Sequence, residues 1–430
     1  MDDTLLHSRA VRILAILSLL FVTALFLIAL FRPSLPYKVE SPTVALNTPE
    51  FAHMMEGMTD AHLQPGSDLQ VLTNGEDFYQ AELDAISHAR QTVNIEAYIV
   101  HKGEMSKRFV DALAERARNG VEVKMVVDAA GSFSTRRGVF EPLLDAGGKV
   151  EWYHPLRWYS FDRVNNRTHR ELMVMDGEKA FIGGAGIADQ WFKAEGADDP
   201  RWRDTMVMVQ GPAVESIQST FVENWLESSG EVLSDPKYFP ITPAKGPSTV
   251  LVVDSSPTSG GSTRARVLFQ ELIASAQHSL YISTPYFLPD TPARDEILRA
   301  VKRGVDVRII TPSKRSDHSV TRSSSHGLLG ELLKNGVHVY EYQPSMIHAK
   351  IMIVDGQWAV VGSTNFDARS FRLNDEVNLA AYAPQFAARL TQDFENDLKN
   401  SRELTYEQWK QRPLWERFTE VLGALIQNEQ

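Results

Sequence analysis

The sequence predicts an α/β fold made of two related halves, preceded by an N-terminal transmembrane helix. Short β-rich runs alternate with helical stretches after about residue 65, which is typical of an α/β protein. The same order of runs returns later in the chain, and a long apolar run precedes both. At 430 residues the chain exceeds the about 250 to 300 residues at which a single core stops growing, so two cores are expected.

The composition is that of a globular protein with an acidic balance. Hydrophobic residues make up 43% of the chain and charged residues 23%, so neither disorder nor a fibrous repeat is indicated. The formal net charge of −11 argues against bulk binding of nucleic acid, which needs clustered Lys and Arg. The absence of cysteine excludes disulfides, thiolate metal sites and a cysteine nucleophile. The oligomeric state stays unknown at this level.

The N-terminal apolar run spans residues 13–31, after a short tail at residues 1–12. Its 19 uncharged residues, at about 1.5 Å each, nearly match a hydrocarbon core of about 30 Å. A cleaved signal peptide is the alternative, but this run is longer than the usual 7 to 15 or so residues and ends without small residues at a cleavage site. We therefore expect a single-pass anchor. Arg9 and Arg12 on one side face Arg32 and Lys38 on the other, so its orientation stays open.

The remaining chain divides into a tether, two halves and a C-terminal helix. Proline-rich residues 32–64 are expected to form the tether, and residues 65–233 and 249–400 the two halves, joined by a linker at 234–248 that is rich in Pro, Ser, Gly and Lys. Each half contains a strand, helix and strand in the same order, at 93–100, 105–119 and 121–128 and again at 280–288, 295–303 and 305–311. Short sequence segments repeat with them. Residues 118–124 resemble residues 302–308, which indicates duplication.

The last segment, residues 401–430, is expected to form an amphipathic helix. Its apolar residues recur at helical spacing opposite charged ones: Leu414, Trp415, Phe418, Val421, Leu422, Leu425 and Ile426. The apolar face either docks on the domain core or enters a lipid interface.

The most informative motif begins at His348. In a strand, His348 and Lys350 project from the same face, and Asp355-Gly356 predicts a turn into a returning strand at 358–361. Gly362, Ser363 and Asn365 then follow at the same edge. An imidazole can attack phosphorus, while Lys, Ser and Asn can stabilise phosphoryl oxygens. No carboxylate cluster at metal spacing accompanies them, so we expect neither a metal nor a cofactor.

A second copy of the motif lies in the first half. His169, Asp176, Gly183 and Gly184 repeat the spacing of His348, Asp355, Gly362 and Ser363. The two copies resemble the HxKxxxxD and GSxN motif of the phospholipase D superfamily. Longer words resemble the bacterial cardiolipin synthases within it, at residues 165–170, 202–205, 211–214, 284–290 and 365–378, and the resemblance covers roughly residues 65–426.

This resemblance implies a duplicated phospholipase D-like fold, with two α/β/α halves related by a pseudo-twofold axis. It implies that both histidines meet in one site, where one forms a phosphohistidine and the other protonates the departing alcohol. Asp204 and Glu376 would orient His169 and His348. Catalytic roles are thus expected for seven residues: His169, His348, Lys350, Asp176, Asp355, Asp204 and Glu376. Contact with the substrate is expected for Gly183, Gly184, Gly362, Ser363, Asn365 and Glu171. The donor would be phosphatidylglycerol, the acceptor a lipid alcohol, and the location a bacterial inner (cytoplasmic) membrane. The sequence leaves open which histidine is the nucleophile.

The first motif departs from the family at two positions, with Glu171 where Lys is expected and Gly186 where Asn is expected. An anion about 4 Å from a phosphate costs about 4 kcal/mol at an effective dielectric of about 20. Glu171 could pair with Lys350 or an Arg and leave reduced activity, adapt the site to another acceptor or to hydrolysis, or mark an inactive scaffold. On the pairing account, Glu171→Lys is expected to raise turnover of phosphatidylglycerol.

Two rival functions follow from the same residues. The pocket chemistry does not specify what is attached to the phosphorus, so a phosphodiesterase or nuclease is the alternative enzyme. A lipid-binding scaffold without turnover is the non-enzymatic alternative.

Overall fold

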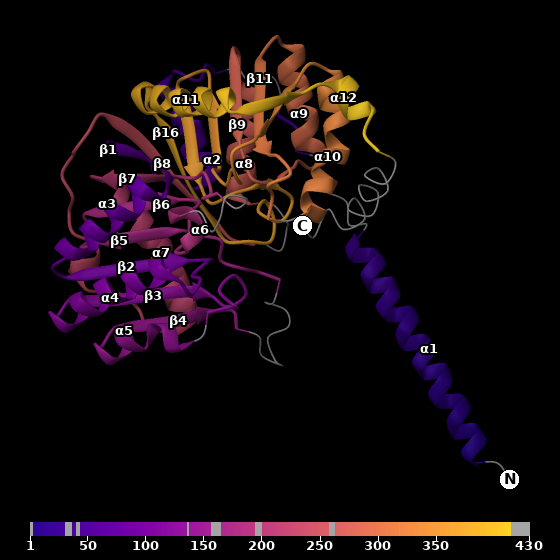
Figure 1. The fold of residues 1–430 in the computed structure, drawn as a ribbon, viewed down its shortest axis with the longest axis horizontal. Helices are drawn as coiled ribbons and strands as arrows, with labels where there is room; N and C mark the ends of the chain where they lie inside the picture. Colours follow the sequence, from indigo (N-terminus) through magenta and orange to yellow (C-terminus); the bar gives the residue numbers. More distant parts are fainter. Residues whose placement is uncertain are drawn as a thin grey trace.

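The computed structural model describes residues 3–30, 37–39, 44–135, 137–155, 165–193, 200–257, 263–317 and 319–413. Within these residues one 15-stranded sheet passes through two halves that lie side by side, purple and orange in Figure 1. The described helices on its two faces are α2 (Pro49–Thr59), α3 (Asn74–His88), α4 (Glu104–Arg118), α5 (Glu141–Asp145), α6 (Asp189–Phe192), α7 (Ala213–Ser229), α8 (Arg264–Ser275), α9 (Thr291–Lys302), α10 (Ser319–Lys334) and α11 (Pro384–Lys399).

The two halves of the sheet have the same strand order. From the centre outward, the first half runs β1 (Gln64–Thr73), β7 (Thr205–Gln210), β6 (Lys179–Gly183), β5 (Leu172–Met175), β2 (Thr92–Ala97), β3 (Glu122–Asp128) and β4 (Lys149–Tyr153). The second half runs β8 (Ser248–Ser255), β16 (Glu376–Tyr382), β14 (Trp358–Gly362), β13 (Ile351–Val354), β9 (Ser279–Ser283), β11 (Asp306–Pro312) and β12 (His338–Tyr342). The halves join where β1 pairs antiparallel with β8. This matched order is the structural form of the duplication.

The core is divided between the faces of the sheet because strand side chains alternate. On β5, Leu172 and Val174 pack in one apolar cluster, whereas Met173 and Met175 pack in another. The first of these clusters is shared by both halves and is covered by α7 and α11. The opposite face is covered by α3 and α4 in the first half and by α2, α8 and α9 in the second. The histidine motifs therefore start at the ends of strands that are buried on both faces.

Most of the predicted strands and helices are found, with two exceptions. The tether predicted at 32–64 contains α2, whose Phe51 and Met55 are buried in the apolar cluster of the second half, so this part of the tether is folded. The predicted strand at 280–288 is split, because β9 ends at Ser283 and β10 (Phe287–Leu288) pairs instead with β15 (Phe366–Asp367) in a separate two-stranded sheet. Pro285 lies at the break, and a proline has no N–H to donate to a continuing ladder.

The C-terminal segment begins differently from the prediction. Residues 401–404 form β17 (Ser401–Leu404), which adds an antiparallel edge strand beside β12, and α12 (Tyr406–Lys410) follows. The prediction of a helix from residue 401 is therefore wrong at its start, because these residues complete the edge of the sheet. The apolar residues from Leu414 onward lie outside the described residues.

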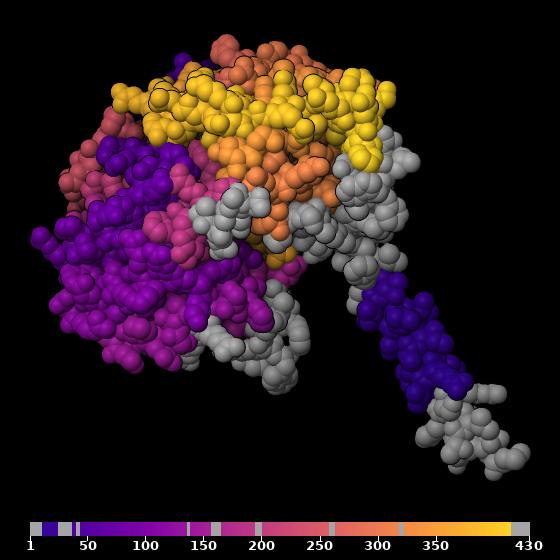
Figure 2. Space-filling view, viewed as in Figure 1, coloured from indigo at the N-terminus to yellow at the C-terminus, as the bar shows by residue number. Residues whose placement is uncertain are grey.

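The N-terminal helix α1 (Asp3–Leu30) stands apart from the two halves in Figure 1. The side chains described on it, at residues 11–24, are all exposed, including Leu14, Leu19 and Phe21 (Figure 2). In the part of the chain that the structure describes, no helix has both the length and the apolar character required to cross a membrane. The predicted membrane span at residues 13–31 stays a prediction.

Candidate active site

Each histidine motif opens a β-hairpin. His169 precedes the β5–β6 hairpin, and His348 precedes the β13–β14 hairpin. The turns have positive φ at two successive residues, 54° and 64° at Asp176-Gly177 and 51° and 63° at Asp355-Gly356. Two such residues are characteristic of the type I′ turn, which Asp-Gly favours. The turn predicted at Asp355-Gly356 is therefore confirmed.

The segments carrying the histidines cross between the halves. The backbone N–H of His169 donates to the carbonyl oxygen of Asp375 at 2.8 Å, and that of His348 donates to the carbonyl oxygen of Arg203 at 2.7 Å. Asp375 lies in the second half and Arg203 in the first. Each half therefore fixes the backbone of the other half's histidine.

Both histidines line one cavity of about 260 Å³ between the halves. The other lining residues are Tyr98, Ile99, Tyr286, Asp317, Asn365, Asp367, Arg369, Ser370 and Asn374. His169 and His348 are 9% and 5% exposed, so their rings lie at the wall of this cavity rather than on an open surface. A small group that enters the cavity can contact both rings.

The carboxylates that hold the histidines are exchanged between the halves. Nδ1 of His169 lies 3.0 Å from Oε2 of Glu376, and Nδ1 of His348 lies 2.8 Å from Oδ2 of Asp204. The pairing expected from the sequence, Asp204 with His169 and Glu376 with His348, is thus reversed, because each carboxylate follows the segment that clasps the opposite histidine. A carboxylate on Nδ1 fixes the tautomer and leaves Nε2 for chemistry.

The electrostatic settings of the two rings differ. Burial and the nearby Lys350 ammonium lower the pKa of His348, so its ring is neutral at pH 7. Burial lowers the pKa of Lys350 to about 8, against the attraction of Asp204. Burial opposes ionisation of Asp204, but its hydrogen bond with His348 and the nearby positive charge of Lys350 outweigh it, and the pKa of Asp204 falls below its ordinary value. Nζ of Lys350 lies 2.8 Å from Nδ1 and 3.0 Å from Nε2 of His348, and it donates to the His348 carbonyl oxygen at 2.8 Å, so its charge lies beside the ring.

Comparison with known proteins identifies the family. The family model described as "Cardiolipin synthase, PLD-like domain" matches residues 83–225 and 269–398. The major cardiolipin synthase ClsA of Bacillus subtilis (strain 168) is 36% identical over 366 residues, which are 84% of this chain and 75% of that protein. A cardiolipin synthase of Geobacillus thermodenitrificans is 32% identical over 401 residues, 92% of this chain and 79% of that protein. The chain belongs to the cardiolipin synthase family.

A solved structure shares the fold of this cardiolipin synthase family member. The crystal structure of a phosphatidylserine synthase from Haemophilus influenzae Rd KW20 superimposes with a TM-score of 0.69 at 15% identity, covering 88% of this chain and 99% of the other. Family membership makes the protein a phospholipase D-type phosphatidyltransferase, an enzyme of phospholipid biosynthesis.

The motif aspartates are placed away from the cavity. Asp176 accepts hydrogen bonds from the backbone N–H groups of Arg90, Gln91 and Thr92, and Asp355 accepts them in the same way from residues 277, 278 and 279. Each carboxylate thereby fixes the start of the neighbouring strand, β2 or β9. Seven residues of extended chain, at about 3.3 Å each, separate either aspartate from its histidine. This placement supports a structural role for both in place of the predicted catalytic one.

Of the residues predicted to bind substrate, the three glycines leave space for neighbouring groups. Gly183 and Gly362 end β6 and β14, where an added Cβ would lie 2.5 Å from the Thr205 carbonyl and 2.3 Å from the Val377 carbonyl, so they permit close strand packing. At Gly184 an added Cβ would meet Cδ of Lys350 at 2.8 Å, so this glycine leaves room for the lysine.

Ser363 and Asn365 follow the second hairpin with different roles. The Ser363 hydroxyl donates to the carboxylate of Glu376 and so holds the partner of His169. Asn365 lines the cavity, where its Oδ1 is buried without a hydrogen-bond partner among the described residues. Asn365 is thus a predicted binding residue that lies at the cavity and has an unpaired polar atom.

Glu171 does not make the predicted ion pair. Its Oε1 accepts hydrogen bonds from the backbone N–H groups of Tyr98 and Ile99, at 3.1 and 3.2 Å. Burial raises its pKa well above the ordinary value, although the Ile99 N–H and Lys350 favour its charge. The ion pair with Lys350 expected from the sequence is absent from the described residues, because the two backbone donors hold the carboxyl group elsewhere.

Several cavity residues were missed by the sequence reasoning. Asp367 and Arg369 lie within the 365–378 word that resembles the family, but nothing in their spacing marked them as cavity residues. Burial raises the pKa of Asp367 to about 6, so it gains a proton as the pH falls through about 6. Tyr98 meets the His169 ring edge-on, with ring centroids 5.1 Å apart. The sequence placed Tyr98 inside the strand predicted at 93–100, whereas β2 ends at Ala97.

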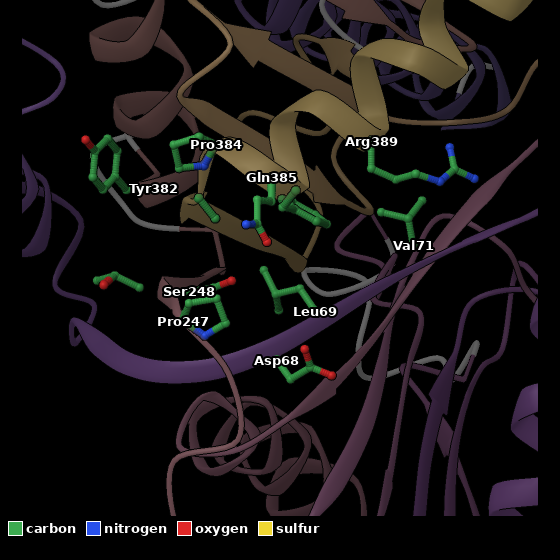
Figure 3. Close-up of a pocket in the computed structure, with 12 residues that line it drawn as sticks. Asp68, Leu69, Val71, Pro247, Ser248, Tyr382, Pro384, Gln385 and Arg389 are labelled. Atoms are coloured by element: carbon green, nitrogen blue, oxygen red, sulfur yellow. The ribbon is translucent and has the colours of Figure 1, made fainter.

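A second cavity, of about 470 Å³, lies at the opposite end of the central strands (Figure 3). Asp68, Leu69 and Val71 from β1 form one side, and Gln385 and Arg389 from α11 form the other. On β16, Tyr382 lines this cavity, whereas Glu376 at the other end of the strand holds His169. No histidine or lysine is among its lining residues, so the phosphoryl chemistry belongs to the first cavity.

Proposed function

We propose that this enzyme makes cardiolipin from phosphatidylglycerol through a phosphohistidine intermediate. The observation that carries the proposal is the single cavity lined by His169 and His348, each held through Nδ1 by a buried carboxylate of the other half. Two imidazoles held through Nδ1 at one cavity provide a nucleophile and an acid–base group.

The reaction consists of two displacements at phosphorus. In the first, Nε2 of one histidine forms a bond to phosphorus, and the bond from phosphorus to the oxygen of the head-group glycerol breaks. The other histidine donates its Nε2 proton to that oxygen. In the second, a hydroxyl oxygen of another phosphatidylglycerol attacks phosphorus, its proton returns to the second histidine, and the phosphorus–nitrogen bond breaks. The products are cardiolipin and glycerol.

We assign the nucleophile to His348. Its lowered pKa keeps the ring neutral, and Lys350 beside Nε2 can bind a phosphoryl oxygen. His169 then acts as acid and base, with Glu376 stabilising its protonated form. Mass spectrometry of a rapidly quenched reaction is expected to locate the phosphatidyl group on the peptide containing His348; a label on the His169 peptide reverses the assignment.

The membrane is part of the proposal. The exposed apolar residues of α1 support an anchor at residues 13–31, which would keep the cavity close to its lipid substrates in a bacterial inner membrane. The side of the membrane on which the enzyme works is left open by the charges flanking α1.

The deciding experiment uses the full chain in detergent with labelled phosphatidylglycerol. We expect labelled cardiolipin and free glycerol, and a loss of about 10⁴-fold in His169→Ala and in His348→Ala. His53→Ala is the matched control, because His53 is 83% exposed on α2, and it should keep full activity. Phosphatidic acid as the main product would indicate hydrolysis, and cleavage of a DNA substrate run in parallel would favour the nuclease.

A further inference from the structure

The two halves differ at the position of the motif lysine. Leu172 lies opposite Glu96 in the β2–β5 pair, and Ile351 lies opposite Ser283 in the β9–β13 pair, so the two registers coincide. Glu171 is therefore the structural counterpart of Lys350. In the same register Tyr98 corresponds to Pro285, which has no N–H. The first half thus offers a pair of backbone donors that the second half cannot form.

Glu171 and Gly186 fit together as a pair. A Cβ added at Gly186 would lie 3.0 Å from Oε1 of Glu171 and 2.5 Å from the carbonyl oxygen of Ile99. The counterpart of Gly186 is Asn365, whose side chain lines the cavity. The two departures from the family motif are thus one change, because the glycine makes room for the acid.

The surroundings of Glu171 favour its neutral form. The residue is 5% exposed and makes no ion pair with a described residue, so an ionised carboxylate would be costly. Lys350 attracts its charge, Asp204 repels it, and its charge also acts on the phenols of Tyr79 and Tyr98. Because Oε1 already accepts two N–H groups, the proton is placed on Oε2, which makes no hydrogen bond with a described residue.

We propose that Glu171 acts as a neutral hydrogen-bond donor to a phosphoryl oxygen of the substrate, in place of the lysine of the first motif. The backbone donors to its Oε1 come from Tyr98 and Ile99, which both line the histidine cavity. A phosphodiester carries one negative charge, which the Lys350 ammonium can neutralise, so a neutral second donor completes the site without excess charge. This inference rests on the proposed function and names one of its substrate-positioning groups.

Three substitutions test the proposal in the phosphatidylglycerol assay. Glu171→Gln keeps a neutral donor of the same shape and should retain kcat. Glu171→Ala should lower kcat by about 10²-fold, the loss typical of one oxyanion donor. Glu171→Lys should also lose activity, because its ammonium would face two backbone N–H donors; this reverses the increase expected from the sequence. Glu178→Gln is the control, since Glu178 is exposed on the same hairpin turn.

Infrared difference spectroscopy measures the protonation state of Glu171 independently of turnover. The spectrum of the wild-type protein minus that of Glu171→Gln at pH 7 should contain the carbonyl band of a protonated carboxylic acid. In a His348→Ala background, short-chain phosphatidylglycerol should shift this band as the hydrogen bond forms. A carboxylate band, or no shift with lipid, overturns the proposal.

The outcomes separate the two proposals. If the wild-type protein makes no cardiolipin, the proposed function fails, while the infrared band still reports on Glu171. If the wild-type protein is active and Glu171→Gln is as impaired as Glu171→Ala, the proposed function stands and the donor role of Glu171 is overturned.

Discussion

At the residue scale, the charge state of Lys350 is expected to set the upper limit of the pH range in which the enzyme works. Its pKa of about 8 means that the ammonium is present below that pH and is lost as the pH rises through it. Because the neutral amine cannot stabilise phosphoryl oxygens by charge, we expect kcat/KM to fall above about pH 8. Lys350→Arg should have a lower kcat but no fall at that pH, since arginine stays charged. A pH profile of kcat/KM for the wild-type and Lys350→Arg proteins tests this. If Lys350→Arg shows the same alkaline fall, the titration of another group causes it.

The residue types in the sequence predicted the chemistry of the site, but they did not predict which side chains contact one another. The repeated spacing placed His169 and His348 in equivalent hairpins, because local turn chemistry and strand alternation act over a few residues. The exchange of carboxylates could not be predicted in this way, since His169 and Glu376 are 207 positions apart and His348 and Asp204 are 144 apart. Only the packing of one half on the other determines those partners.

The hairpin is the element in which the motif aspartates act. Asp355 receives three backbone N–H groups at the start of β9, and its own φ of 51° is a conformation that alanine adopts poorly. Asp355→Ala is expected to lower the free energy of unfolding by about 1 to 3 kcal/mol. The kcat of the folded fraction should be unchanged. Urea unfolding beside activity measured at low temperature tests this, and a variant with full stability but no turnover would restore a catalytic role.

Elements were predictable where their signals are local. The strand β11 and the helix α4 follow runs of β-branched residues or helical periodicity, and both were found close to their predicted limits. The strand predicted at 280–288 failed because the apolar pattern continues through Pro285, while the hydrogen-bond ladder cannot. β17 was missed because an edge strand is stabilised by its partner β12 rather than by its own sequence.

At the scale of the whole molecule, α1 is separable from the catalytic halves. Its described side chains are exposed, so it contributes little to their folding. A chain lacking residues 1–36 is expected to move from the membrane pellet to the soluble fraction and to retain the far-ultraviolet circular dichroism of the folded halves. Fractionation after cell lysis measures this. A truncated chain that stays in the membrane pellet would place the anchor elsewhere.

The reciprocal clasp, in which Arg203 and Asp375 bind the backbones of the opposite histidines, also constrains how the two copies can diverge. A duplicated gene ordinarily frees one copy to drift while the other keeps its task. Here that freedom is limited, because each copy supplies the backbone and carboxylate contacts that hold the histidine of the other copy. We therefore expect substitutions retained in one half to be those that preserve the shared active site, such as Glu171 together with Gly186.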